Sequence, residues 1–278
     1  MPYPIAKLAY GLRCRLHDLA IPTERYQLQI AAGISTICPP IQTMHPEPAK
    51  LPSFTYQDGN VTVSRYNVGK DDPVYYSDYL KLYNANLENL TTEPFDHFLG
   101  IKFLELHNSR VSKVGFEKLS RLVSAGNILR IVVHENTNAS YVLKVSDLLT
   151  IFPNLNSISF GRVPVADTWM TEIQQFHEHR LTDFDLVITL EQFFALSTDD
   201  LVAFLQGQKK GFHLIMEVEQ TGEIIPITLD LPNFPYCKLV TGFFDTDMDY
   251  DEELLQYKDN TRLQLQIFAN GPIYVWFL

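Results

Sequence analysis

The chain has few cysteines, no long apolar run and little positive charge. Its 278 residues include only three cysteines, Cys14, Cys38 and Cys237, and no C-x-x-C pair. So sparse and odd a set argues against a disulfide framework or a zinc site and favours a reducing compartment. No apolar run reaches membrane-spanning length, and no signal-peptide core follows the N-terminus. We therefore predict an intracellular protein, cytoplasmic or nuclear, with no membrane partner.

The shortage of basic residues argues against nucleic-acid binding. Lys and Arg number 22 against 33 Asp and Glu, which gives a formal net charge of −11. A nucleic-acid surface needs clustered cations, because affinity comes largely from counterions released from the phosphates. The chain has no Lys/Arg run longer than Lys209-Lys210. We expect no nucleic-acid partner, while an apolar fraction of 46% is sufficient for a folded globular protein.

The strongest pattern present is a repeat of the form apolar-x-x-apolar-x-apolar. Its clear copies follow one another at an almost constant step, a degraded copy follows after a slightly longer one, and a worn first copy begins at Leu80-Leu82. Strand-like runs at such an even spacing, with helical patterns between them, are typical of β-α repeat proteins whose units must stack. We predict an α/β fold, an irregular leucine-rich-repeat-like β-α solenoid of five to seven repeats. The copies are Ile101-Leu104-Leu106, Ile128-Ile131-Val133, Leu155-Ile158-Phe160, Leu181-Phe184-Leu186 and Gly211-Leu214-Met216.

The segments that flank the repeats predict three parts: a helical element over 1–38, a proline-rich spacer over 39–53 and a recognition domain over 54–278. Pro22 marks the first position of a second helix, which ends at Gly33. Five prolines within fourteen residues predict an extended spacer. Residues 54–63 predict a hairpin that turns at Asp58-Gly59.

The pattern loosens after residue 211. Residues 212–219 and 224–231 predict a hairpin across Thr221-Gly222. The last alternating runs, 263–267 and 273–277, predict a capping strand pair that turns at Asn270-Gly271.

The N-terminal element resembles the F-box, in which a leucine start and further apolar positions precede a proline that opens the second helix. The stretch around Leu190-Glu191 and Leu196 to Leu205 is also similar to the F-box-associated repeats of some divergent F-box proteins. The residues behind the F-box likeness are Leu8, Leu12, Leu16, Leu19, Pro22 and Leu28.

This resemblance implies a non-enzymatic substrate-recognition subunit of a cullin-based (SCF-type) ubiquitin ligase. The N-terminal residues, from Leu8 to Ile30, would bind the ligase adaptor subunit of the cullin complex, and the repeats would present an unknown protein target. It implies no cofactor. The alternative is a stand-alone leucine-rich-repeat-like interaction scaffold, in which the two helices only cap the first repeat.

Motifs for catalysis or metal binding are incomplete. Asp245, Asp247 and Asp249 have the spacing of a calcium loop, but Tyr250 and Gln256 stand where the loop needs glycine and glutamate. An enzyme that uses Asp245 and Asp247 of this loop with a divalent metal is the second alternative.

Two further groups of side chains have an open interpretation. His177 and His179 lack the i, i+4 spacing of a zinc helix, which favours a solvated helix end. Four tyrosines precede the first clear repeat, where packing and a recognition surface are both open; they are Tyr75, Tyr76, Tyr79 and Tyr83.

Overall fold

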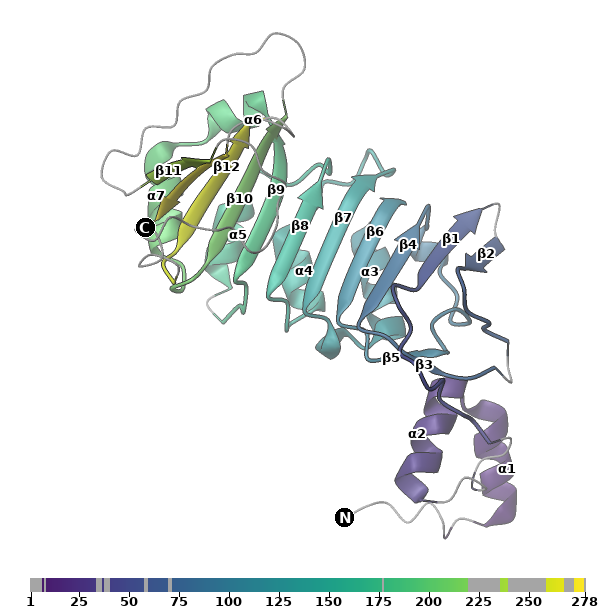
Figure 1. Ribbon diagram of the computed structural model, residues 1–278. Coiled ribbons are helices and arrows are strands. Elements are labelled where there is room, and N and C mark those ends of the chain that lie inside the picture. Colours follow the sequence, from purple (N-terminus) through teal and green to yellow (C-terminus); the bar gives the residue numbers. More distant parts are fainter. Residues whose placement is uncertain are drawn as a thin grey trace. The chain divides into compact units, whose positions relative to one another are not determined.

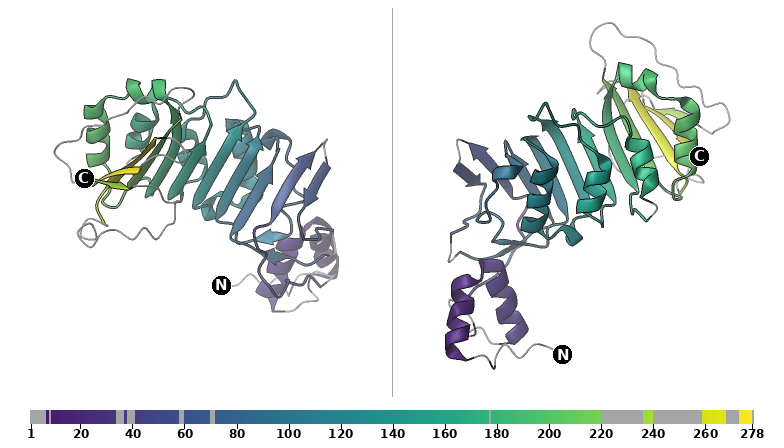
Figure 2. Two further views of the ribbon diagram at one scale, coloured as in Figure 1. Left: turned by 45° about the horizontal axis from the view of Figure 1, so that its top comes forward. Right: turned by 180° about the vertical axis from the view of Figure 1, so that it is seen from behind.

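The computed structural model describes residues 7, 9–33, 37, 41–57, 60–69, 72–176, 178–219, 236–239, 259–267 and 273–277. The chain divides into two compact units, residues 1–128 and 129–278. Each unit contains a mostly parallel set of strands with helices on one face (Figures 1 and 2). The predicted α/β class is therefore confirmed.

The first unit begins with a helical hairpin and continues into strands in the order β2-β1-β4-β6. Strand β1 pairs with β2 in antiparallel and with β4 in parallel fashion, and β4 pairs with β6 in parallel. Strands β3 and β5 form a separate parallel pair. The elements are α1 (Tyr10–Leu19), α2 (Pro22–Ala32), β1 (Ser53–Gln57), β2 (Asn60–Val63), β3 (Tyr75–Tyr76), β4 (Tyr79–Tyr83), η3 (Leu87–Asn89), β5 (Phe98–Leu99), β6 (Phe103–Ser109), α3 (Lys113–Val123) and η4 (Ala125–Asn127).

The two N-terminal helices form where the sequence predicts them. Pro22 occupies the first turn of α2, where its missing N–H is not needed. The Ile21 N–H before it donates to Glu24 Oε2 at 3.2 Å. Gly33 ends the helix with φ of 66°, a left-handed conformation that glycine adopts without strain, and its N–H donates to the Ile30 carbonyl.

The described part of the proline-rich segment is extended and bound along the first unit. The His45 N–H donates to the Val74 carbonyl at 2.8 Å, and the Ala49 N–H donates to the Tyr76 carbonyl at 2.7 Å. Met44 also forms an isolated parallel bridge with Val74. This segment therefore adds an ordered edge to the unit.

The second unit places its strands in the order β7-β8-β9-β10-β12-β13-β11. The first five of these run parallel, and β13 is antiparallel to both β12 and β11. Helices α4, α5 and α7 cover one face of the sheet (Figure 2). The elements are β7 (Arg130–Asn136), α4 (Val145–Ile151), β8 (Ser157–Gly161), α5 (Trp169–Gln175), β9 (Asp183–Thr189), α6 (Leu190–Ala195), α7 (Thr198–Gln206), β10 (His213–Glu219), β11 (Tyr236–Leu239), β12 (Arg262–Ile267) and β13 (Ile273–Phe277).

The repeated apolar positions meet in register and form the core. Ile131, Ile158, Phe184, Leu214 and Leu263 pair in one row across five parallel strands. All five side chains are fully buried. In the first unit Leu80 and Leu104, which pair across β4 and β6, are buried in the same way. The sequence pattern therefore identified the core strands correctly.

The C-terminal strands follow the prediction in part. Strands β12 and β13 form the expected antiparallel pair, although its turn at Asn270-Gly271 and the other predicted turn at Asp58-Gly59 lie outside the described residues. The hairpin predicted between 212–219 and 224–231 is wrong. Strand β10 has β9 on one edge and β12 on the other, so both rows of its backbone hydrogen-bonding groups are already paired. Residues 224–231 themselves lie outside the described residues.

Candidate protein-docking site

Helix α2 packs its polar side against the rest of the first unit. Thr23 and Gln29 are both buried. The Thr23 N–H donates to the Asp96 carbonyl at 3.0 Å, and Gln29 Oε1 accepts from the Gln42 N–H at 3.0 Å. Gln42 Nε2 donates in turn to the Asp72 carbonyl at 2.6 Å. These directional contacts fix the helix on the segment that follows it.

Arg25 is the most deeply buried charge of this interface, with 1% of its surface exposed. Its guanidinium donates to Gln42 Oε1 at 3.3 Å and to the Ala20 carbonyl at 3.4 Å. No described carboxylate forms an ion pair with it, so hydrogen bonds to neutral oxygens are what stabilise the buried charge. Burial lowers the pKa of nearby His97, and the positive charge of Arg25 lowers it further. Arg25 therefore holds α2 in one orientation.

The opposite side of the hairpin is apolar and open to solvent. Leu12 is 54% exposed and Leu19 72%. Between the two helices lies a groove of about 430 Å³, here called the hairpin groove. A cluster of exposed apolar side chains is a feature of protein interaction sites. The groove is lined by Leu16, Leu19, Ala20, Glu24, Gln27, Leu28 and Ala31.

The predicted adaptor-binding residues divide into three groups in the structure. Leu16, Leu19 and Leu28 line the hairpin groove, and Leu12 is exposed on α1. Pro22 is buried at the start of α2, where it orients the helix. Leu8 lies outside the described residues. The groove residues Ala20 and Ala31 were not singled out from the sequence, because small side chains give a weak apolar signal.

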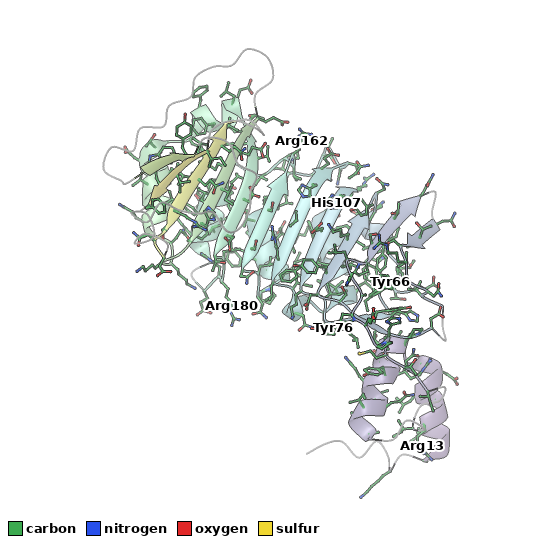
Figure 3. All side chains as sticks on the ribbon, in the orientation of Figure 1. Arg13, Tyr66, Tyr76, His107, Arg162 and Arg180 are labelled. Carbon is green, nitrogen blue, oxygen red and sulfur yellow. The ribbon has the colours of Figure 1, made fainter. Side chains whose placement is uncertain are left out.

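The helix-free face of the first unit's strands presents a second surface, of aromatic and charged side chains. Tyr79 lies against Phe103 with ring centroids 4.7 Å apart, and Tyr83 stacks on His107 at 4.7 Å. Between these pairs Lys81 and Glu105 form an ion pair, beside the His107 labelled in Figure 3. Burial opposes ionisation of Glu105, but hydrogen bonds from Lys81 and His107 outweigh it and lower its pKa.

The tyrosines before the first clear repeat differ in their burial. Tyr75 is buried and packs on Tyr66 and Phe98 with centroids 4.9 Å and 5.5 Å away. Tyr76 and Tyr79 are exposed. Packing is therefore confirmed for Tyr75, while a recognition role for the exposed Tyr76 and Tyr79 stays a prediction.

A polar cluster occupies the helix-free face of the second unit. Asp183 Oδ1 lies 3.7 Å from His213 Nδ1, and the Thr182 hydroxyl donates to Asp183 Oδ2 at 2.7 Å. Burial opposes ionisation of Asp183, but its contacts with His213 and Thr182 outweigh burial and lower its pKa. Further along the same strand, Asp185 accepts a hydrogen bond from the Ser159 hydroxyl at 2.9 Å. Burial nevertheless raises the pKa of Asp185 to about 6.

These opposite shifts predict opposite effects of removing the two charges. The raised pKa of Asp185 contributes stability below its ordinary value of 3.8, and this contribution is lost as the pH rises through about 6. Asp185→Asn, whose amide oxygen can still accept from Ser159, is expected to raise the free energy of unfolding at neutral pH by about 1–2 kcal/mol. Urea titrations over a range of pH measure the gain, which should shrink toward acid pH.

Asp183→Asn is the matched control on the same strand. The lowered pKa of Asp183 contributes stability above 3.8 that is lost as the pH falls, so this substitution should destabilise the chain at neutral pH. Equal destabilisation by both substitutions at neutral pH would contradict the assignment of Asp185 as a carboxylate penalised by burial.

The loop on which the catalytic alternative depends lies outside the described residues. No group of three or more His, Cys, Asp or Glu side chains in this part of the chain is arranged to hold a metal ion. Asp245, Asp247 and His177 lie outside the described residues. Burial lowers the pKa of His179, whose ring accepts the Leu181 N–H at 3.2 Å. Each described helix is too short or too polar to span a bilayer.

No protein-family model, curated protein or solved structure matches this chain. The hairpin groove and the helix-free faces are therefore interpreted from their own geometry.

Proposed function

We propose that this chain is the substrate-recognition subunit of a cullin-based ubiquitin ligase. The hairpin of α1 and α2 would dock on the ligase adaptor, and the strands and helices that follow would capture a protein target. The chain itself would perform no chemistry. It would act by raising the local concentration of the target beside the ligase's catalytic partner.

The observation that supports adaptor docking is the inverted polarity of the hairpin. A helix on a protein surface usually buries its apolar side and exposes its polar side. Here α2 buries Arg25 and Gln29 and leaves Leu28 at an open groove with Leu16 and Leu19. Such an arrangement is favourable when a second protein covers the apolar side.

The finer fold that we propose is an irregular leucine-rich-repeat-like solenoid preceded by this F-box-like hairpin. It is supported by parallel strands that recur at similar steps along the chain, as in the pairs Arg130 with Ser157 and Ser157 with Asp183. Helices α4 and α5 connect β7 to β8 and β8 to β9, and the apolar row continues from each of these strands to the next. Repeat proteins of this kind mainly present binding surfaces.

The alternative of a stand-alone scaffold, in which the hairpin is only a cap, is favoured by the hydrogen bonds of Thr23 and Gln29 to the first unit. A cap, however, covers the apolar edge of the first repeat. In the strand order of the first unit the outermost strand is β2, and the helical hairpin does not take that edge position. The groove also remains open, so we prefer the docking role.

Co-expression with the ligase adaptor and cullin tests the proposal directly. The full chain and a chain that begins at residue 34 would be purified separately through an affinity tag on the cullin. We expect the full chain to co-purify and the shortened chain to be lost. Circular dichroism of both chains would establish whether the shortened chain is folded. Failure of the folded full chain to co-purify would leave the scaffold as the better interpretation.

A further inference from the structure

A second apolar cavity lies in the second unit, where β9 meets helices α5, α6 and α7. Its volume is about 420 Å³, which is within the range of ~300–1,000 Å³ for ligand sites. Buried Val165, Trp169 and Ile188 line it together with half-buried Met170 and Leu196. We call this cavity the α6 pocket.

The pocket results from the way in which the chain leaves β9. The step from β9 to β10, from Asp183 to its partner His213, is longer than the two steps before it and contains two helices. Helix α6 begins at once, because Thr189 and Gln192 cap it reciprocally at 3.1 and 3.2 Å. Ser197 then caps α7 by accepting the Asp200 N–H at 3.3 Å. The two capped helices and the link at Leu196 between them therefore form a defined wall of the cavity.

The rim of the α6 pocket is acidic. Asp167, Glu191 and Asp200 line it and are exposed, and none of them forms an ion pair with a described residue. Among the described residues, no lysine or arginine lines the pocket. The neighbouring Arg162, labelled in Figure 3, is held by Glu219 at 2.9 Å instead. The rim therefore presents a negative potential around an apolar interior.

We propose that the α6 pocket binds an apolar side chain of a protein target, flanked in that target by lysine or arginine. The interior supplies apolar contact for one anchor side chain, and the three carboxylates attract cations on either side of it. The statement that the bound protein is a ligase target rests on the proposed function. As a binding site, the pocket is tested on this chain alone, in an assay without adaptor or cullin.

Fluorescence anisotropy with the full chain and a labelled peptide, GSKRLRKSG, provides the test. The control peptide replaces its single leucine by serine and keeps every charge. Loss of a buried leucine side chain is expected to weaken binding about tenfold or more. Equal affinity for the two peptides would overturn the proposal, because it would leave only general attraction to an acidic protein. Absence of binding by the leucine peptide would overturn it too.

A charge-matched pair of variants isolates the rim. The rim variant combines Asp167→Asn, Glu191→Gln and Asp200→Asn. The control variant makes the same change in net charge at exposed carboxylates outside the pocket, by Glu47→Gln, Glu178→Gln and Asp259→Asn. We expect the rim variant to bind the leucine peptide about tenfold more weakly than the control variant. Equal binding by the two variants would contradict the role of the rim.

Ala195→Arg tests the pocket by blocking it. Ala195 is exposed and lines the cavity, so a long cationic side chain there is compatible with the fold while it repels the peptide. Binding should be lost with an unchanged circular dichroism spectrum. Sedimentation of the chain without peptide tests whether a second copy of the chain fills the pocket. Self-association that Ala195→Arg abolishes would show that it does and would overturn the proposal.

Discussion

Leu16→Asp is expected to weaken binding to the ligase adaptor about a hundredfold while the rest of the chain stays folded. Leu16 lines the hairpin groove from α1, opposite Leu28 of α2. A carboxylate at this position would have to be desolvated within an apolar interface, and no basic residue in the described part of the chain lines the groove to pair with it. Binding of the purified chain to the adaptor, followed by isothermal titration calorimetry, measures the effect.

Two further variants separate docking from folding. Leu19→Asp changes a side chain that is 72% exposed, so it should weaken adaptor binding with little effect on the stability of the hairpin. Val114→Asp introduces the same charge at an apolar residue of α3 that is 62% exposed and lies outside the groove. Adaptor affinity should be unchanged by Val114→Asp. Unaltered affinity in Leu16→Asp would reject the F-box-like assignment.

Phe184→Ala is expected to reduce the free energy of unfolding by about 3–5 kcal/mol. Phe184 is fully buried in the middle of the apolar row of the second unit. Its ring meets Phe160 edge-on at 5.8 Å and lies 5.2 Å from the ring of Trp169. Truncation would leave a cavity between the sheet and helix α5, which the paired strands and the packed helix cannot fully collapse to fill. Urea denaturation followed by tryptophan fluorescence measures the loss.

Phe194→Ala is the matched control for this substitution. Phe194 is 62% exposed on α6, so the same change of side chain should alter stability by no more than about 0.5 kcal/mol. A loss in Phe184→Ala as small as that in Phe194→Ala would mean that the apolar row is not the core of the second unit.

The sequence was sufficient to predict the parallel strands because the repeat contains two independent signals. The alternation of apolar and polar residues identifies each strand and the residues on its buried face. The constant step between copies identifies the strand that lies beside it. Together these signals placed Ile131, Ile158 and Phe184 correctly. Past residue 211 the step is lost and only alternation remains. Alternation defines a strand without defining its partner, which is why β10 was paired with the following segment and not with β12.

The docking site was predictable in part for a similar reason. Leucine spacing identified two helices and the residues on their apolar side. It could not show that α2 is anchored by its polar side, because that depends on Gln42 and Asp96, which contact Arg25 and Thr23 only in the folded chain. The α6 pocket left no sequence signal, since it arises from a short link between two capped helices at Leu196.

The unequal steps between paired strands also have an evolutionary consequence. Among the four parallel pairs β4–β6, β7–β8, β8–β9 and β9–β10, the step is shortest between β4 and β6, where Tyr79 pairs with Phe103, and longest between β9 and β10, where Asp183 pairs with His213. The register of the apolar rows is nevertheless kept within each unit, so differences in length are absorbed by the connections. A lineage can add or delete residues there, and so acquire a new cavity such as the one beside α6, without a compensating change in any strand. Strands and connections of this chain are free to diverge at different rates.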